Sequence, residues 1–311
     1  MKVVITGGAG FVGGNLCRVL ADRQADVVVV DDFSTGYKSN LTGLDTTLYE
    51  GSILDRGLLA VACDGADSIV HLAARASVPR SIAEPVATNE VNVTGTLNVL
   101  EAARKQDAHV VVASSSSVYG AGPPLPKHEG LAAAPSSPYA ASKLAAESYA
   151  RAYQDVFNLQ AIAFRFFNIY GPLQSVGHPY AAAVPTFIAR LVAGEPIPVY
   201  GDGRQTRDFT SVASVIEVLA EAVTARITHR GPVNLAFGSR TSLRELIAML
   251  EEVSGRTAVI DPRPDRAGDI RDSQADCSTL LRLFPQARQE PLRRGLDNTL
   301  SWFLETGGRQ E

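Results

Sequence analysis

A cluster of glycines follows the first apolar stretch of the chain. Residues 3–6 are Val-Val-Ile-Thr, and residues 7–13 are Gly-Gly-Ala-Gly-Phe-Val-Gly. Glycines in this pattern allow a tight turn from a strand into a helix. They also let the backbone approach a pyrophosphate, which the unpaired N–H groups at the helix N-terminus then bind. The sequence therefore predicts a strand, a phosphate-binding turn and a helix that begins near Phe11.

The next apolar strand is expected at residues 27–30 and ends in two acidic residues, Asp31 and Asp32. An acidic side chain at this position accepts hydrogen bonds from the adenosine ribose of a dinucleotide, and it repels a 2′-phosphate. The sequence therefore favours NAD over NADP as the cofactor.

Short apolar runs rich in β-branched residues recur through the first half of the chain, with helical patterns between them. Because these runs are continuous rather than alternating, they indicate strands of a parallel sheet that helices cover on both faces. We therefore expect a doubly wound α/β domain over residues 1–168. Its expected strands cover residues 3–6, 27–30, 68–71, 110–113 and 161–166, and its helical patterns include residues 15–23 and 95–105.

The pattern changes after residue 168, where prolines such as Pro172, Pro185 and Pro198 interrupt short helices. We expect a smaller C-terminal domain over residues 169–311, and we expect residues 208–237 to return to the first sheet. In such an architecture the cofactor binds to the first domain, and the substrate binds in the crevice between the two domains.

Composition restricts the possible partners. The 311 residues carry 29 Lys and Arg against 33 Asp and Glu, so the chain lacks the basic excess that nucleic-acid binding requires. No apolar run approaches the ~18 residues of a membrane span, and the N-terminus does not resemble a signal peptide. Cys17, Cys63 and Cys277 lack the paired spacing of a metal site. We therefore expect a soluble cytoplasmic protein without a metal, a membrane or a nucleic acid as its partner.

Four serines, at positions 114–117, follow the strand expected at residues 110–113. Open α/β sheets place their chemistry at the carboxyl ends of such strands. Downstream, Tyr139 and Lys143 share one face of an expected helix because they stand four residues apart. We expect the Lys143 ammonium to lower the pKa of the Tyr139 phenol from about 10, so that Tyr139 can act as a base. With the serine hydroxyls holding a substrate alcohol, these residues predict hydride transfer between an alcohol and a ketone.

These motifs together resemble those of the extended short-chain dehydrogenases/reductases. More narrowly, the chain resembles the nucleotide-sugar epimerases close to UDP-glucose and UDP-N-acetylglucosamine 4-epimerases. The resemblance covers nearly the whole chain, including residues 71–74, 164–172 and 199–209. It implies an N-terminal Rossmann domain with a small substrate-binding domain, tightly held NAD, a UDP-sugar substrate and a homodimer. The dimer would use the helices at residues 95–105 and 139–157, with an apolar face formed by Ala145, Tyr149, Ala152 and Tyr153.

The resemblance also assigns roles by position. Ser115 would contact the substrate, Tyr139 would be the acid/base, and Lys143 would modulate Tyr139 and bind the ribose of NAD. Besides Tyr139 and Lys143, the residues that would hold NAD are Gly7, Gly10, Phe11, Val12, Gly13, Asp31, Asp32, Phe33, Ser34, Thr35, Gly36, Ser52, Ile53, Leu72, Ala73, Ala74, Asn92 and Phe167. Besides Tyr139, those that would hold the UDP-sugar are Ala76, Ser115, Ser116, Ser117, Asn168, Gln174, Tyr200, Arg207, Arg266, Asp269 and Ser273.

Two residues depart from the family pattern. Ser52 stands where the family usually presents an aspartate to the adenine amino group, and Gly14 stands where a small hydroxyl residue is more usual. A serine still accepts a hydrogen bond, so the prediction of NAD stands.

The resemblance narrows the reaction. The related 4,6-dehydratases carry an adjacent Asp-Glu pair where this chain has Ser116 and Ser117, so dehydration is disfavoured. Epimerisation at C4 through a 4-keto sugar needs only the hydride cycle. Ser273 replaces a bulky tyrosine that restricts some epimerases, and Ala76 and Gln174 also resemble the N-acetyl-tolerant members. We expect activity on UDP-glucose and UDP-galactose, and on their N-acetylated counterparts. The alternatives are a dehydratase, a UDP-uronate epimerase or decarboxylase relative, and an NAD-binding scaffold without activity.

Overall fold

The computed structural model describes residues 1–122, 124–176, 182–264 and 271–308. Its main element is a seven-stranded sheet in the order β11-β6-β5-β4-β1-β2-β3, in which all neighbouring strands are parallel. This sheet, with helices on both faces, confirms the expected doubly wound α/β fold. The strands are β1 (Lys2–Thr6), β2 (Asp26–Asp31), β3 (Thr46–Glu50), β4 (Ser68–His71), β5 (His109–Ser115), β6 (Ala161–Phe166) and β11 (Pro232–Leu235).

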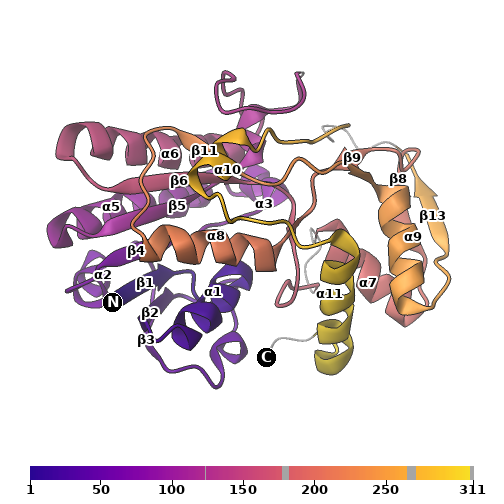
Figure 1. Cartoon of the computed structure of the whole chain (residues 1–311), viewed down its shortest axis with the longest axis horizontal. Coiled ribbons are helices and arrows are strands. Elements are labelled where there is room, and N and C mark those ends of the chain that lie inside the picture. The colour runs from indigo at the N-terminus through magenta and orange to yellow at the C-terminus, as the bar shows by residue number, and fades with distance from the viewer. Residues whose placement is uncertain (123, 177–181, 265–270, 309–311) are drawn as a thin grey trace.

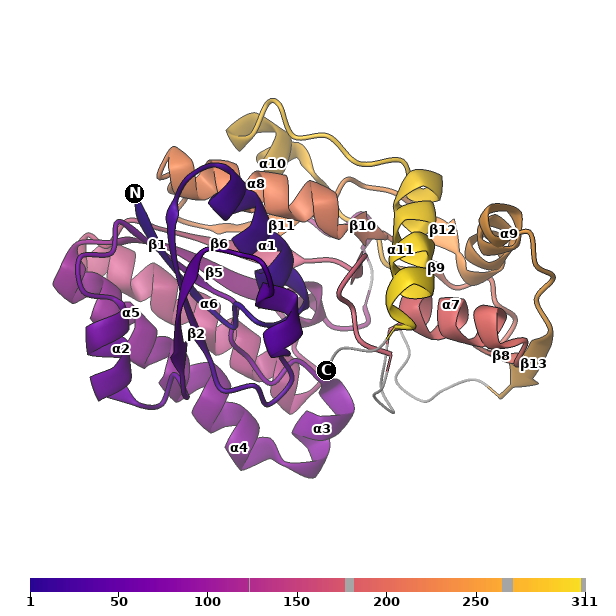
Figure 2. The same cartoon turned by 90° about the horizontal axis from the view of Figure 1, so that it is seen from below.

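Helices cover both faces of the sheet, as Figures 1 and 2 show. Val3 and Ile5 of β1 pack into one hydrophobic core with Leu16 and Val215. Val4, which points the other way, packs into a second core. The first face carries α1 (Phe11–Asp22), α8 (Val212–Thr224) and α10 (Ser278–Leu283), and the second carries α2 (Arg56–Ala62), α5 (Gly95–Gln106) and α6 (Pro138–Phe157).

One strand of the sheet, β3, was not expected from the sequence, whereas β11 falls in the expected return segment at residues 208–237. β3 lies at one edge and reads Thr-Thr-Leu-Tyr-Glu, with most of its side chains exposed or half-buried. An edge strand of this kind has no continuous apolar run, which explains why the pattern missed it. β11 lies at the other edge and pairs with β6, so the chain returns to the sheet after residue 208.

The helix expected at residues 95–105 continues a longer helical segment. α3 (Val78–Ala83) and α4 (Pro85–Asn89) precede a π-helical turn at Glu90–Thr94, which leads directly into α5. A π turn inside a helical segment inserts one extra residue and is frequent at functional sites. Asn92 lies in this turn and is buried.

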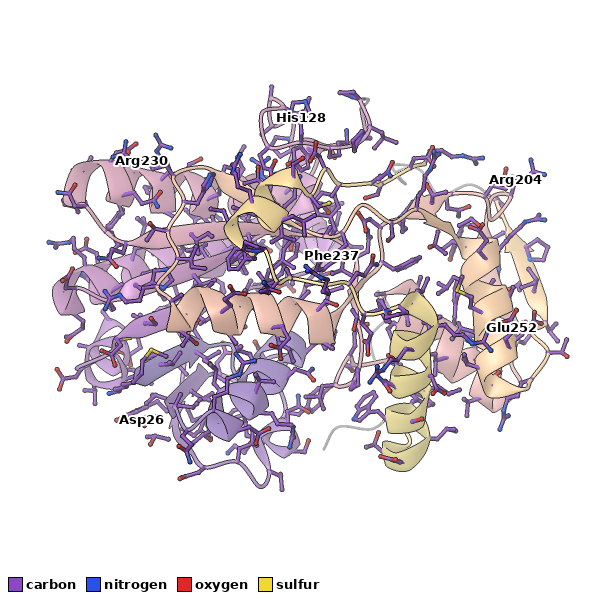
Figure 3. All side chains as sticks on the ribbon, viewed as in Figure 1. Asp26, His128, Arg204, Arg230, Phe237 and Glu252 are labelled. Carbon is purple, nitrogen blue, oxygen red and sulfur yellow. The ribbon has the colours of Figure 1, made fainter. Side chains whose placement is uncertain are left out.

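The remaining elements form a second lobe beside the carboxyl edge of the sheet, on the side of α11 in Figure 1. Phe187, Ile197, Leu246 and Leu296 are buried in its own hydrophobic core. Charged side chains such as Arg204 and Glu252 cover its outer surface (Figure 3). Its helices are α7 (Ala183–Ala193), α9 (Leu243–Ser254) and α11 (Leu292–Thr306), and its short strands pair as β7 (Ile169–Tyr170) with β10 (Thr210–Ser211), β9 (Thr206–Arg207) with β12 (Thr241–Ser242), and β8 (Ile197–Tyr200) with β13 (Ile260–Arg263). In the described part of the chain, no helix has the length and apolar character needed to cross a membrane.

The glycine turn is closed by contacts between backbone atoms. Gly7 has a φ of +73°, which favours glycine, and its N–H donates to the carbonyl of Val30 at 2.8 Å. A Cβ atom on Gly13 would lie 2.2 Å from the carbonyl oxygen of Gly7. α1 can therefore pack against β1 only if residue 13 has no side chain.

This contact predicts the effect of Gly13→Ala. The added methyl group meets backbone atoms that cannot move aside, so we expect the free energy of unfolding to fall by about 1–3 kcal/mol. Gly122→Ala is the matched control, because a Cβ atom there meets nothing within 4 Å, and its effect should stay within about 0.5 kcal/mol. Urea unfolding measures both changes, and equal stability of the two variants would show that the turn tolerates a side chain.

Candidate active site

A cavity of about 530 Å³ opens at the carboxyl edge of the sheet. It extends from the glycine turn to the serine segment, and Gln174 borders it from the C-terminal lobe. The predicted site residues that line it are Gly7, Gly10, Phe11, Val12, Gly13, Asp31, Asp32, Ser34, Thr35, Ile53, Leu72, Ala73, Ala74, Ala76, Ser115, Tyr139, Lys143 and Gln174. Ser114, one of the four expected serines, lines it too. Sequence reasoning assigned no site role to Gly51, Arg75, Val91, Phe166 or Ile169, which line it as well.

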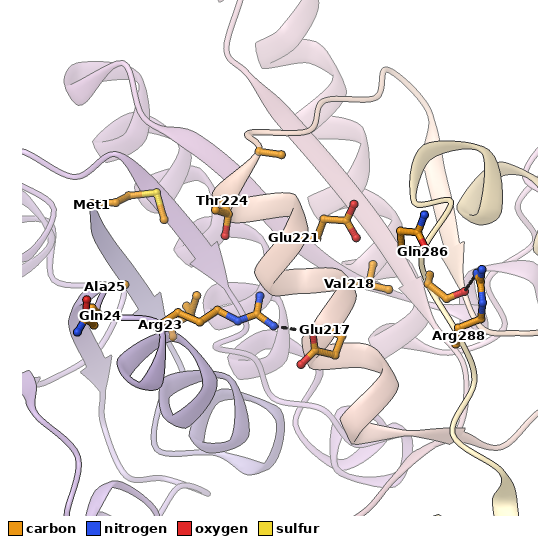
Figure 4. A pocket seen from close by; sticks show the side chains of 13 residues that line it. Met1, Arg23, Gln24, Ala25, Glu217, Val218, Glu221, Thr224, Gln286 and Arg288 are labelled. Carbon is orange, nitrogen blue, oxygen red and sulfur yellow. Dashed lines mark hydrogen bonds and ion pairs between the residues drawn. The ribbon is translucent and has the colours of Figure 1, made fainter.

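A second and larger cavity, of about 690 Å³, lies between the C-terminal ends of α1 and α8 (Figure 4). Arg23 and Glu217, on its rim, form an ion pair, and Met1 and Ala25 mark its place at the amino ends of β1 and β2. It contains none of the predicted site residues. Since parallel sheets bind ligands at their carboxyl ends, the smaller cavity is the candidate active site.

The glycine turn offers a site for the pyrophosphate of NAD. α1 begins at Phe11, as expected, and Gly10 gives it no side-chain cap, so its first N–H groups stay available to an anion. Asp31 braces the turn: one carboxylate oxygen accepts from the N–H of Ala9 and the other from the N–H of Phe33, both at 2.9 Å. Burial raises the pKa of Asp31, against these two hydrogen bonds. The sequence predicted a ribose contact for Asp31 but missed this bracing role.

The structure shows the surroundings of Ser52 and Gly14, the two residues that depart from the family pattern. The hydroxyl of Ser52 accepts from the N–H of Leu54 at 3.2 Å, and Ser52 does not line the cavity, although its neighbour Gly51 does. A Cβ atom on Gly14 would lie 3.1 Å from both Asn40 and Leu173. The absence of a side chain at Gly14 therefore lets the segment after β7 approach α1.

His71 connects the ends of β1, β4 and α5. Its Nδ1 lies 2.8 Å from Thr6 Oγ1, and its Nε2 lies 2.9 Å from Thr96 Oγ1. Thr96 donates its only hydroxyl proton to the carbonyl of Asn92, so it must accept from Nε2–H, and Nδ1 then accepts from Thr6. Burial, and to a smaller extent the charge of Lys143, lower the pKa of His71 to about 3. The ring is therefore neutral at physiological pH.

Asn92 supports the loop that lines the cavity but does not line the cavity itself. Its Oδ1 accepts from the N–H of Arg75 at 2.8 Å, and its Nδ2 donates to Ser142 Oγ at 2.9 Å. The π-helical turn directs this side chain between the loop and α6. The predicted direct contact of Asn92 with NAD stays a prediction, and the structure adds this bracing of residues 72–76.

The three predicted catalytic residues come together at the end of β5. Ser137 caps α6, and Lys143, one turn after Tyr139, donates from Nζ to the carbonyl of Ala113 at 2.9 Å. Burial lowers the pKa of Lys143 to about 8, so it is still mostly cationic at neutral pH. Ser115 Oγ accepts from the N–H of Ser117 at 3.2 Å and from the Ser117 hydroxyl at 2.9 Å. The Ser115 proton is therefore left for Tyr139, whose phenolate the Ser115 hydroxyl favours.

The expected direction of the Tyr139 pKa shift was wrong for the protein by itself. Burial raises the pKa of Tyr139, and the hydrogen bond with Ser115 opposes that shift. Lys143 directs its ammonium to the carbonyl of Ala113 instead. Ser115 is therefore the group of this chain that favours the phenolate, and Lys143 anchors the helix that carries Tyr139.

Of the residues predicted to hold the nucleotide diphosphate, Asn168, Tyr200 and Arg207 lie on the C-terminal lobe or at its border. The N–H of Ser273 donates to the carbonyl of Thr206, the residue before Arg207, and Arg207 donates to that same carbonyl. Asn168 Nδ2 donates to the carbonyl of Asp208 at 3.2 Å. The predicted site residues that do not line the described cavity are Phe33, Gly36, Ser52, Asn92, Ser116, Ser117, Phe167, Asn168, Tyr200, Arg207 and Ser273. Two further predicted residues, Arg266 and Asp269, lie outside the described residues.

Gln174, which lines the cavity, has an unused acceptor. Its Nε2 donates to the carbonyl of Ile169 at 3.1 Å, and its Oε1 is buried without a hydrogen-bond partner among the described residues. A buried acceptor of this kind is usually satisfied by a ligand or water. Over the same residues, no group of three or more His, Cys, Asp or Glu side chains is arranged to hold a metal ion.

Comparison with known proteins decides the family. Residues 3–236 match the model of the NAD dependent epimerase/dehydratase family. The chain belongs to that family. Its dependence on NAD, expected from the glycine turn and Asp31, is thereby confirmed, as is the resemblance to extended short-chain dehydrogenases/reductases.

Similar members of the family differ in reaction. UDP-glucose 4-epimerase of Mycolicibacterium smegmatis is 34% identical over 317 residues, covering 97% of this chain and 98% of that protein. UDP-glucuronic acid decarboxylase 1 of Arabidopsis thaliana is 33% identical, covering 97% of this chain and 70% of that protein. A UDP-N-acetylglucosamine 4-epimerase of Methanobrevibacter ruminantium, solved with UDP-N-acetylmuramic acid, superimposes with a TM-score of 0.93 at 33% identity, covering 98% of each chain. The reaction must therefore be argued from the site.

The buried His71 predicts a pH dependence of stability. Its pKa is about 3 in the folded protein and about 6.5 in the unfolded chain, so the unfolded chain binds the extra proton as the pH falls through this window. We expect this group to lower the free energy of unfolding by about 2 kcal/mol between pH ~7 and pH ~5. Urea unfolding of the wild type and of His71→Gln, which cannot titrate, isolates the effect. Equal losses in the two proteins over this range would contradict a neutral His71.

Proposed function

We propose that the protein interconverts the C4 epimers of UDP-sugars, UDP-glucose with UDP-galactose and UDP-GlcNAc with UDP-GalNAc. The observation that carries this proposal is the Ser115, Tyr139 and Lys143 arrangement at the end of β5. Among the residues that line the described cavity, the carboxylates are Asp31 and Asp32, which lie at the glycine turn. The described cavity therefore offers no carboxylate beside Ser115 that could assist elimination or decarboxylation. A hydride cycle does not need such a carboxylate.

The proposed mechanism assigns the proton to Tyr139. NAD, held at the glycine turn, supplies the acceptance and return of the C4 hydride. The Tyr139 phenolate takes the proton of the sugar 4-hydroxyl, and the Ser115 hydroxyl stabilises the phenolate. Once the carbon is a ketone, the sugar turns its other face to the nicotinamide, and Tyr139 returns the proton. Lys143 keeps Tyr139 aligned through its bond to β5.

We also propose a division of labour between the two parts of the chain. Residues 1–168, with the return segment 208–237, would bind NAD. The remainder of residues 169–311 would bind the UDP-sugar, with its diphosphate held by arginine forks at Arg207 and Arg266. Gln174 Oε1 supports this assignment, since a hydroxyl or an acetamido N–H of the sugar would satisfy it. A cytoplasmic location stays a prediction from the sequence.

A homodimer is part of the same proposal. Exposed apolar side chains lie along α6, where Tyr149, Val156 and Phe157 have 39%, 69% and 48% of their surface exposed. Tyr153 is turned inward and bonds to Glu101 of α5, so it joins the two helices rather than facing outward. Pairing of α5 and α6 with their copies would cover the exposed side chains in a four-helix interface. Sedimentation at micromolar concentration should give the mass of a dimer, and a monomer would contradict this.

Removal of one phenolic oxygen tests the mechanism. Tyr139→Phe should lower kcat for UDP-galactose by about 100-fold to 10,000-fold, because it removes the acid/base. Bound NAD and the free energy of unfolding should change little. Tyr149→Phe, on the same helix but exposed, is the matched control and should keep full activity. Near-normal turnover in Tyr139→Phe would overturn the assignment of the base.

A bulkier residue 273 tests the choice of sugar. Ser273→Tyr should lower kcat/KM for UDP-GalNAc by about 10-fold to 100-fold relative to UDP-galactose, because the ring occupies space needed by the acetamido group. Ser273→Ala, the control, should leave both activities in place. Product separation after incubation with UDP-galactose and with UDP-GalNAc gives kcat/KM for each sugar. UDP-galacturonate is tested in the same way. Unchanged sugars in all three reactions would favour a dehydratase, a decarboxylase relative or a scaffold.

A further inference from the structure

A buried ion pair lies beneath the serine segment and takes no part in the mechanism above. Glu147 of α6 and Arg165 of β6 form a two-pronged pair, with Arg165 Nη2 2.6 Å from Glu147 Oε1 and Arg165 Nε 3.0 Å from Glu147 Oε2. Their side chains are 10% and 4% exposed. A buried pair of this kind adds little net stability compared with apolar residues of similar size. Its position therefore suggests another role.

The pair belongs to a row of polar residues that crosses three strands. Ser114 of β5, Arg165 of β6 and Asn234 of β11 are register partners on adjacent strands, and all three are buried. Partners in register direct their side chains to the same face of a sheet. Glu147 reaches this row from α6, and the hydroxyl of Ser114 donates to its Oε2 at 2.9 Å.

The far end of the serine segment returns to the same row. The guanidinium of Arg165 lies 4.5 Å from the centre of the Tyr119 ring. The Tyr119 hydroxyl donates to Asn234 Oδ1 at 2.6 Å. Residues 114–119 thus form an arch that contains Ser115, Ser116 and Ser117. Its first residue, Ser114, contacts Glu147, and its last residue, Tyr119, contacts Arg165 and Asn234.

Three successive turns of α6 contact three neighbouring residues of β5. Lys143 bonds to the carbonyl of Ala113, Glu147 bonds to Ser114, and Tyr139 interacts with Ser115. Since these three helix residues stand four apart, they lie on one face. Glu147 is the member of this set that also contacts β6, so it fixes α6 relative to two strands at once.

We propose that Glu147 and Arg165 are positioning residues, which hold the arch so that Ser115 stays in place beside Tyr139 in the cavity. Neither side chain is required to touch the substrate or NAD. Loss of the pair lets Ser115 move away from Tyr139 and slows the chemical step, while substrate binding is preserved. The assay of turnover rests on the proposed function, but the alignment of Ser115 with Tyr139 does not.

The test separates positioning from stability. In Ser114→Ala/Glu147→Leu/Arg165→Met, apolar side chains replace the pair and its serine partner, so no buried charge is left without its partner and folding should be retained. We expect kcat to fall by about 10-fold to 100-fold, with KM changed less than about 3-fold. Arg151→Gln/Asp155→Asn, which removes an exposed pair on the same helix, is the matched control and should keep its kcat.

A second readout needs no substrate. The Tyr139 phenol faces Ser115 of β5 and Lys143 of its own helix, and α3 contacts residue 139 through the Ser81 hydroxyl, which accepts from its backbone N–H. Ultraviolet titration of the holoenzyme against its Tyr139→Phe counterpart measures the ionisation of Tyr139. It should move to higher pH in the apolar variant, because the hydrogen bond from Ser115 is lost. A purely structural pair would leave it in place.

The outcomes are distinguishable. Wild-type kcat together with an unmoved Tyr139 titration in the apolar variant would overturn the inference. Should that variant not fold, Ser114→Ala decides, since it removes only the bond to Glu147 and should shift both readouts in the same direction. Failure of the wild type to epimerise any UDP-sugar would overturn the proposed function alone, and the titration would still decide whether the pair positions Ser115.

Discussion

The parallel alignment of the strands is the constraint from which the rest of the molecule follows. Because β1, β2, β4, β5 and β6 run in the same direction, their carboxyl ends lie at one edge of the sheet. The last residues of these strands are Thr6, Asp31, His71, Ser115 and Phe166. The glycine turn and the serine segment both begin there. Residues from distant parts of the sequence therefore share one cavity, and the C-terminal lobe has only to border it.

Several buried polar groups keep this edge in place. Asp31 holds the glycine turn, His71 joins two strands to α5, and Glu147 with Arg165 joins α6 to β5 and β6. Each of these side chains makes at least two hydrogen bonds, as is usual for buried polar groups, although Arg165 Nη1 is buried without a partner among the described residues. The charges that remain near the chemistry are few, so Ser115 and burial dominate the ionisation of Tyr139 in the protein itself. NAD and substrate enter a site whose polar groups are already oriented.

Patterns in the sequence predicted what depends on local chemistry. The glycine turn, the buried strands β1, β2, β4, β5 and β6, and the Tyr139–Lys143 face of α6 all follow from spacing and residue type. These patterns did not predict β3, because an edge strand needs no continuous apolar run. They did not predict the Glu147–Arg165 pair either, because that pairing depends on the register of β5 with β6. The π-helical turn at Asn92 and the tautomer of His71 depend on tertiary contacts, which no local pattern records.

The central claim is that C4 epimerisation proceeds by removal and return of a hydride, with Tyr139 moving only the hydroxyl proton. Incubation of the enzyme with UDP-galactose, and separately with UDP-GalNAc, in deuterium oxide tests this most directly. The account predicts conversion to the C4 epimer with no solvent deuterium on any sugar carbon, as read by mass spectrometry and proton NMR. Deuterium at C4 or C5 of the product would contradict it, because a carbon-bound proton would then have exchanged with solvent.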